Sequence, residues 1–106
     1  MSFRGMRRFD DSIAAYREAI RGAPDRADIY VNFGVVLDAA GKVEDSESAY
    51  RAAIKLDPVL YQAHFNLGVL LGESLKRRED ALELYRESIR IRPDFPDAYH
   101  TIGTTL

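Results

Sequence analysis

Apolar residues recur along most of this chain at the spacing of an α-helix. One such set, at i, i+3, i+4 and i+7, is Tyr30, Phe33, Gly34 and Leu37. A helix places these four positions on a single face. The alternating pattern of a half-buried strand is absent from the sequence, and Gly41-Lys42 and the prolines interrupt the helical pattern. The sequence therefore predicts an all-α protein with six helices, at about 7–22, 27–40, 43–56, 61–75, 78–91 and 96–106.

The helical pattern is repeated along the chain. Gly34 and Gly68 are 34 residues apart, and Gly68 and Gly103 are 35 residues apart. The same spacing links two further sets, Tyr16, Tyr50 and Tyr85, and Pro24, Pro58 and Pro93. The extra residue of the second interval must lie between Leu71 and Tyr85. We expect it in the turn around 75–78, because an insertion within a helix would rotate its faces by about 100°.

A repeat of 34 residues built from two helices resembles the tetratricopeptide repeat family. In one unit the matching residues are Tyr30, Phe33, Gly34, Leu37, Gly41, Tyr50, Ala53 and Pro58. In the next they are His64, Leu67, Gly68, Leu71, Ala81, Tyr85, Ser88 and Pro93. The resemblance implies a right-handed superhelical solenoid of antiparallel helix pairs. Ser46 and Ser88 depart from the family pattern, which usually has alanine there, and the turn after Glu73 lacks the usual glycine.

The register of the repeat gives the expected organisation of the single array. If the first helix of a repeat is A and the second is B, the order is B-A-B-A-B-A. Residues 7–24 form the second helix of a partial repeat, 27–60 a full repeat, 61–95 a full repeat with the one-residue insertion, and 96–106 the first helix of a partial repeat.

Both end helices of this register lack their partner. One interpretation is a piece of a longer array, because repeats are stabilised by their neighbours. The other is a self-assembling scaffold, in which terminal half-repeats of neighbouring molecules complete each other head-to-tail as a homo-oligomer. The residues expected in such a self-association are Phe9, Ile13, Tyr16, Tyr99, Ile102 and Leu106.

The resemblance also implies that the A helices line a concave groove that binds a protein or peptide. The residues expected to face this groove are Asp28, Val31, Asn32, Val35, Asp38, Gln62, Phe65, Asn66, Val69, Glu73, His100 and Thr101. Phe65 is the expected hot spot, since aromatic side chains often anchor ligands. The alternative is that Phe65 packs against the next A helix.

Asn32 and Asn66 recur 34 residues apart in the A helices. A side-chain amide offers both a donor and an acceptor, so it can pair with a peptide group. This arrangement resembles the asparagine ladder in the repeat arrays of O-linked N-acetylglucosamine transferase, and it predicts an extended peptide ligand. The alternative is that both amides form hydrogen bonds with neighbouring helices.

Charge narrows the expected ligand. The A helices contain no lysine or arginine, and their acidic residues are Asp28, Asp38, Glu73 and Asp97. Because a groove of one sign attracts the opposite charge, we expect a neutral or basic peptide. The alternative is that these acids only solubilise helix ends. The resemblance also argues against binding of chaperone C-terminal tails, since the lysine and arginine that clamp the tail carboxylate in one branch of the family are missing here.

Composition sets the remaining expectations. The chain of 106 residues has 15 basic and 17 acidic residues, so nothing in it indicates nucleic-acid binding. It has no cysteine and only two histidines, and it shows no phosphate loop, nucleophile motif or metal-ligand spacing. No apolar run is long enough to cross a membrane. We therefore expect a non-catalytic protein without cofactor, metal or membrane contact, in the cytoplasm or nucleus.

Overall fold

The computed structural model describes residues 2–73, 76–94, 96 and 100–101. Within this part the chain forms five helices and no strand, α1 (Ser2–Gly22), α2 (Ala27–Ala39), α3 (Val43–Leu56), α4 (Tyr61–Glu73) and α5 (Arg78–Ile91). The predicted all-α class is confirmed. The count of six helices is not reproduced in the described part, because the expected helix at 96–106 lies mostly outside it. Helix α1 begins at Ser2 rather than near residue 7, since no proline interrupts the residues between.

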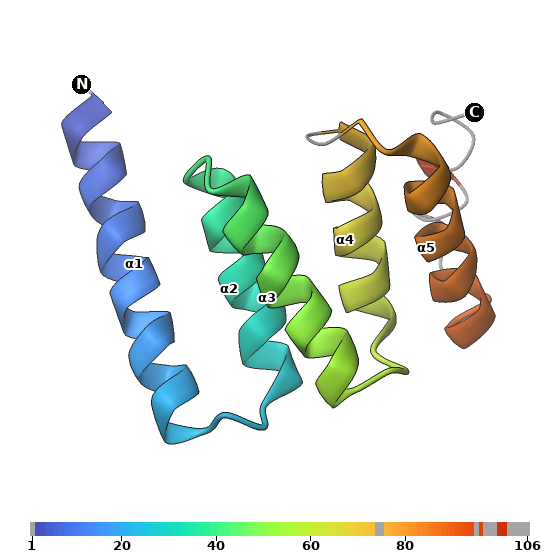
Figure 1. Cartoon of the computed structure of the whole chain (residues 1–106), viewed down its shortest axis with the longest axis horizontal. Coiled ribbons are helices and arrows are strands. Elements are labelled where there is room, and N and C mark those ends of the chain that lie inside the picture. Colours follow the sequence, from blue (N-terminus) through green and yellow to red (C-terminus); the bar gives the residue numbers. More distant parts are fainter. Residues whose placement is uncertain (1, 74–75, 95, 97–99, 102–106) are drawn as a thin grey trace.

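Consecutive helices run in opposite directions across the molecule (Figure 1). Helix α2 packs against α3, α4 against α5, and α3 joins the two pairs by packing against α4. Helix α1 packs against α2, and α2 also contacts α4. The helices therefore form a solenoid of antiparallel pairs in which α2 and α4 run parallel to each other as neighbouring first helices.

The interior of each pair is built around a glycine and a tyrosine. A Cβ atom added to Gly34 would lie 2.5 Å from Cε1 of Tyr50, and one added to Gly68 would lie 2.6 Å from Cε1 of Tyr85. Both tyrosines are buried, with 3% and 1% of their surfaces exposed. The absence of a side chain on the first helix thus allows the ring of the second helix to lie directly on its backbone.

The two serines that depart from the family pattern connect paired helices. Ser46 is fully buried, and its Oγ donates a hydrogen bond of 2.6 Å to the backbone oxygen of Gly34. Ser88 is also fully buried, and its Oγ lies 3.0 Å from the backbone oxygen of Leu84 and 3.3 Å from that of Tyr61. Each hydroxyl therefore fits in the space of an alanine and has a backbone acceptor.

The insertion lies in the turn between α4 and α5. The amide of Lys42 donates to the backbone oxygen of Leu37 at 2.8 Å, and the amide of Arg77 donates to that of Leu71 at 2.7 Å. The two bonds close corresponding turns, and the second turn is one residue longer. Gly41, which directly precedes the donor Lys42 in the first turn, has a φ of +82°. Lys76, which directly precedes the donor Arg77 in the second turn, has a φ of +57°.

Candidate functional site

The parallel helices α2 and α4 carry the side chains expected to face a ligand. Asn32 is exposed and Asn66 is half-buried. Neither amide forms a hydrogen bond with another residue of the described part of the chain. The alternative that these amides bond to neighbouring helices is therefore not found, and both side chains keep a donor and an acceptor for another molecule.

Apolar side chains accompany the two amides. Val35 is 48% exposed, and Val69 is half-buried. Val31 was expected in the groove, and this expectation is wrong. Only 8% of Val31 is exposed, because it belongs to the main hydrophobic core where α2 and α4 meet. Val31 is therefore a core residue and is not accessible to a ligand.

Phe65 combines packing with partial exposure. Its ring centroid lies 5.8 Å from that of Tyr85 on α5, at an interplanar angle of 46°. The side chain also packs against the main core and is half-buried. The contact with Tyr85 is with the second helix of the same repeat. The alternative, packing against the next A helix, concerns residues that lie mostly outside the described part of the chain.

The negative charge on this side of the molecule is smaller than the sequence suggested. Asp28 is exposed and forms two hydrogen bonds with Arg26, of 3.1 and 2.9 Å. The hydrogen bond from Arg26 lowers the pKa of Asp28. Arg26 precedes α2 and was not counted among the residues of the A helices. Its guanidinium compensates the charge of Asp28, and Asp97 lies outside the described residues.

Asp38 and Glu73 are the acidic residues that keep their charge uncompensated on these helices. Both lie in the last turn of their helix, and neither forms an ion pair with the residues that the structure describes. The C-terminal end of a helix dipole is negative, so an acidic side chain there does not stabilise the helix. Because α2 and α4 run parallel, the two carboxylates lie at corresponding ends of the surface.

Three further residues were expected in the groove, Gln62, His100 and Thr101. Gln62 is exposed in the first turn of α4. His100 is exposed, and Thr101 is half-buried, in the short helical piece beyond α5. The structure describes too few neighbours of these two residues to relate them to α2 and α4.

The residues expected in self-association do not form a free face on α1. Ile13 is only 6% exposed and packs in a small core with Leu37 and Ala49. The ring of Tyr16 lies 6.0 Å from that of Phe33. Phe9 is half-buried. The expectation that Ile13 is available to a second molecule is therefore wrong, because α2 and α3 of the same chain cover it. Tyr99, Ile102 and Leu106 lie outside the described residues.

The described part of the chain also bears on metal sites and membrane-spanning helices. Across the described ranges, no group of three histidine, cysteine or acidic side chains is placed to hold a metal ion. No helix in the same part of the chain combines the length and apolar character needed to cross a membrane.

Comparison with known proteins decides the family. A model of the tetratricopeptide repeat matches residues 1–58 and again 31–96. The chain belongs to the tetratricopeptide repeat family. The finer resemblance to the arrays of O-linked N-acetylglucosamine transferase remains a prediction. None of the curated proteins matches the chain.

Several solved structures are similar. The MamA protein is 26% identical, with a TM-score of 0.84 over 92% of this chain and 52% of its own. TTC0263, from the thermophile Thermus thermophilus, is 20% identical, with a TM-score of 0.91 over 99% of this chain and 53% of its own. The first repeat domain of Spaghetti (RPAP3), solved with an HSP90 peptide, is 17% identical, with a TM-score of 0.86 over 98% of this chain and 82% of its own. This chain therefore spans about half the length of MamA and TTC0263.

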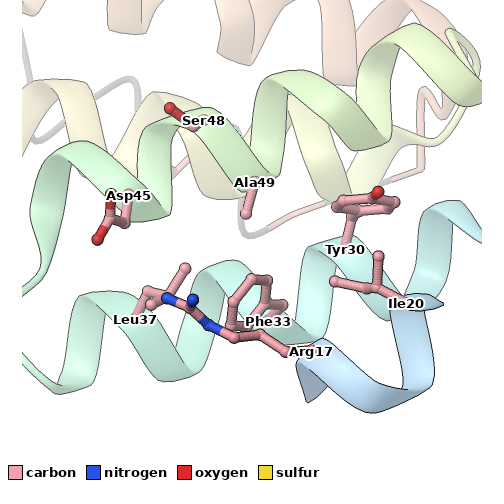
Figure 2. Close-up of a pocket in the computed structure, with 8 residues that line it drawn as sticks. All are labelled: Arg17, Ile20, Tyr30, Phe33, Leu37, Asp45, Ser48 and Ala49. Carbon is pink, nitrogen blue, oxygen red and sulfur yellow. The ribbon is translucent and has the colours of Figure 1, made fainter. Parts of the chain in front are cut away.

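One feature of this tetratricopeptide repeat protein was missed by the sequence reasoning. Side chains of α1, α2 and α3 line a hollow (Figure 2), and its lining includes neither Asn32 nor Val35. The sequence held a signal for it, since Ile13 and Glu47 occupy the same position of successive repeats and differ in polarity. Comparing the repeats position by position would have indicated that the two units differ on this side.

Proposed function

We propose that this chain is a non-catalytic protein-interaction module that binds an extended neutral or basic peptide along α2 and α4. The observation that carries the proposal is the pair of uncommitted amides, Asn32 and Asn66, at the same position of successive repeats. Asn32 is exposed and Asn66 is half-buried, so both amides can reach a ligand at the surface. A side chain that leaves its donor and acceptor free at each repeat is suited to pairing with the backbone of an extended peptide.

The surroundings of the amides support a peptide over a small molecule. Val35, Phe65 and Val69 supply apolar surface beside them, and apolar contact combined with a few fixed polar groups is typical of recognition surfaces. Asp38 and Glu73 place negative charge at one end. We therefore propose that a basic residue of the peptide lies toward that end.

Two structural neighbours lend support from outside the chain. The RPAP3 domain was solved bound to the HSP90 peptide SRMEEVD, and YrrB is described as a tetratricopeptide repeat protein with an unusual peptide-binding site. YrrB is 23% identical over 87% of this chain and 47% of its own, with a TM-score of 0.80. Peptide binding is thus within the capacity of this fold.

The proposal is tested with fluorescein-labelled peptides of one alanine- and leucine-based sequence, carrying lysines, no charge or glutamates. Fluorescence anisotropy at low salt should give binding of the first two and weaker binding of the third, by about tenfold or more. The double change Asn32→Ala and Asn66→Ala should abolish binding of the lysine peptide.

Glu83→Ala is the control, because Glu83 is exposed on α5. It should leave the affinity unchanged. Circular dichroism checks that the double variant keeps its helix content and melts within a few degrees of the wild type. If the correctly folded double variant binds the lysine peptide as tightly as the wild type, the amides do not read the peptide and the proposal is wrong.

A further inference from the structure

A hollow of about 360 Å³ lies over α2, between α1 and α3 (Figure 2). Its base is apolar and consists of Phe33, Leu37 and Ala49, of which the last two are 1% and 5% exposed. Ile20 and Tyr30 close one end. This volume falls within the range of small ligand pockets.

The rim of the hollow carries one basic and one acidic side chain. Arg17 extends from α1 and Asp45 from α3, and in Figure 2 both lie toward the Leu37 end. Both are exposed, and neither forms an ion pair or hydrogen bond with any residue of the described ranges. The hollow thus combines an apolar base with one free cation and one free anion within the part of the chain that the structure describes.

The next repeat contains a corresponding hollow in which the charges are used. It is about 400 Å³ in volume and is lined by residues of α3, α4 and α5. Arg51, the equivalent of Arg17, pairs with Glu47 at 2.8 Å, and Arg77 pairs with Glu47 at 3.4 Å and with Asp80 at 2.9 Å. Asp80 is the equivalent of Asp45. Arg51 and Asp80 thus form ion pairs, whereas their equivalents Arg17 and Asp45 form none within the described part of the chain.

One residue accounts for the missing partner of Arg17. Glu47 pairs with Arg51 and Arg77 beside the second hollow, and the same position in the previous repeat is Ile13, which is buried. An isoleucine cannot pair with Arg17. In addition, His64 lines the second hollow where Tyr30 lines the first. Arg17 and Asp45 thus join no helices through ion pairs in the described part of the chain, although Asp45 lies in the first turn of α3, where an acidic side chain favours the helix dipole.

We propose that this hollow is a second docking site, which takes an apolar side chain of a partner peptide flanked by an acidic and a basic residue. The apolar anchor contacts Phe33 and Leu37, the peptide's carboxylate pairs with Arg17, and its cation pairs with Asp45. Pairs of opposite charge across an interface fix the orientation of a ligand. A uniformly charged peptide could pair with only one of the two side chains, Arg17 or Asp45. On α2, the helical period places Tyr30 and Phe33 on the face opposite Asn32 and Val35, so both sites can be occupied together.

The test uses a phage-displayed library of short random peptides selected on the wild-type protein, with counterselection on Ser48→Trp. Ser48 is exposed at the rim, so a tryptophan there covers the hollow without entering the core. Enriched peptides should share an apolar residue with an acid and a base within one helical turn. A labelled copy of the leading peptide should bind Ser48→Trp and Arg17→Glu at least about tenfold more weakly than the wild type.

The repeat supplies a matched control. Glu83 occupies the position of Ser48 in the second hollow, so Glu83→Trp adds the same side chain at the equivalent place and should leave the affinity unchanged. Replacing the acidic residue of the peptide by a basic one should restore binding to Arg17→Glu. The Asn32→Ala, Asn66→Ala protein should bind the peptide as the wild type does, which separates this site from the surface of α2 and α4.

The proposal is overturned if no enriched peptide depends on Ser48 and Arg17. It is equally overturned if the leading peptide loses affinity for the Asn32→Ala, Asn66→Ala protein and keeps it for Ser48→Trp. That second result would assign the peptide to the surface of α2 and α4 and would leave the proposed function intact.

Discussion

At the scale of single residues, small side chains decide how closely the helices approach. Gly34 and Gly68 each lie under one buried tyrosine ring, while the backbone oxygen of Gly34 also accepts the hydrogen bond of Ser46. Protein interiors are packed to the density of organic crystals, so an additional methyl group has no free volume to enter. The glycine and the tyrosine of each pair therefore depend on each other.

We expect Gly34→Ala and Gly68→Ala each to lower the free energy of unfolding by about 1–3 kcal/mol, because the added methyl group overlaps a tyrosine ring. Urea denaturation followed by circular dichroism measures the change. Gly22→Ala is the control, since no atom lies within 4 Å of the added Cβ, and it should be neutral or slightly stabilising. Equal stability of all three variants would contradict the tight packing described above.

Tyr50 should make the protein sensitive to alkaline pH. Burial raises the pKa of its phenol to about 12 from 10.0. A group with a raised pKa in the folded state stabilises the fold fully below its unfolded pKa, and this contribution is lost as the pH rises through the folded value. Stability should therefore fall between about pH 10 and pH 12, by about 2–3 kcal/mol for this group. Unfolding by urea across this range should show a smaller fall for Tyr50→Phe, and an identical fall would assign the effect to other groups.

At the scale of elements, the turns between paired helices carry the variation between repeats. Gly41 and Lys76 occupy the same place in two successive turns, and both have positive φ angles. Glycine adopts such a conformation without cost, whereas a lysine side chain is strained there. The longer second turn is therefore also the less favourable one.

We expect Lys76→Gly to raise the free energy of unfolding by about 1 kcal/mol, since it relieves a left-handed conformation. Gly41→Ala should lower it by a similar amount in the first turn. Thermal melts of both variants compare the two turns within one protein. A destabilised Lys76→Gly variant would show that the lysine side chain makes contacts that outweigh its backbone strain.

Sequence reasoning was most successful where a pattern is local and repeated. Four of the helices lie within two residues of their predicted bounds. It failed where two helices cover one residue. Val31 was expected on the groove surface and Ile13 on the free face of the first helix. A neighbouring helix buries both side chains. Periodicity identifies a face of a helix, but it does not say how far the next helix extends over it.

At the scale of the whole molecule, the distribution of charge separates possible ligands. Helices α2 and α4 contain no basic residue, and Asp38 and Glu73 remain unpaired within the described part of the chain. Basic side chains lie in the other helices and in the turns, as Arg26 does at the start of α2. A ligand along α2 and α4 therefore meets negative charge near its path.

We expect the peptide SRMEEVD, which binds the RPAP3 domain, not to bind this protein measurably. Its acidic residues and terminal carboxylate would meet Asp38 and Glu73 without a lysine or arginine on these helices to receive them. Isothermal titration calorimetry at low salt measures the affinity. The same peptide with its two glutamates changed to lysine is the comparison and should bind more tightly. Strong binding of SRMEEVD would remove the electrostatic part of the proposed function.

The sequence by itself determined the period of the repeat, because equivalent residues recur along the chain, and the bounds of four helices, because helical spacing is a property of neighbouring residues. Only the tertiary structure decided which charges are free. The pairing of Asp28 with Arg26 removes one acid from the count, and the network around Glu47 uses charges whose equivalents beside Ile13 stay unpaired. Arg77 and Glu47 are 30 residues apart, so their pairing depends on how the helices pack. Arg26 and Asp28 are two residues apart, and their pairing depends on the side-chain conformations at the start of α2.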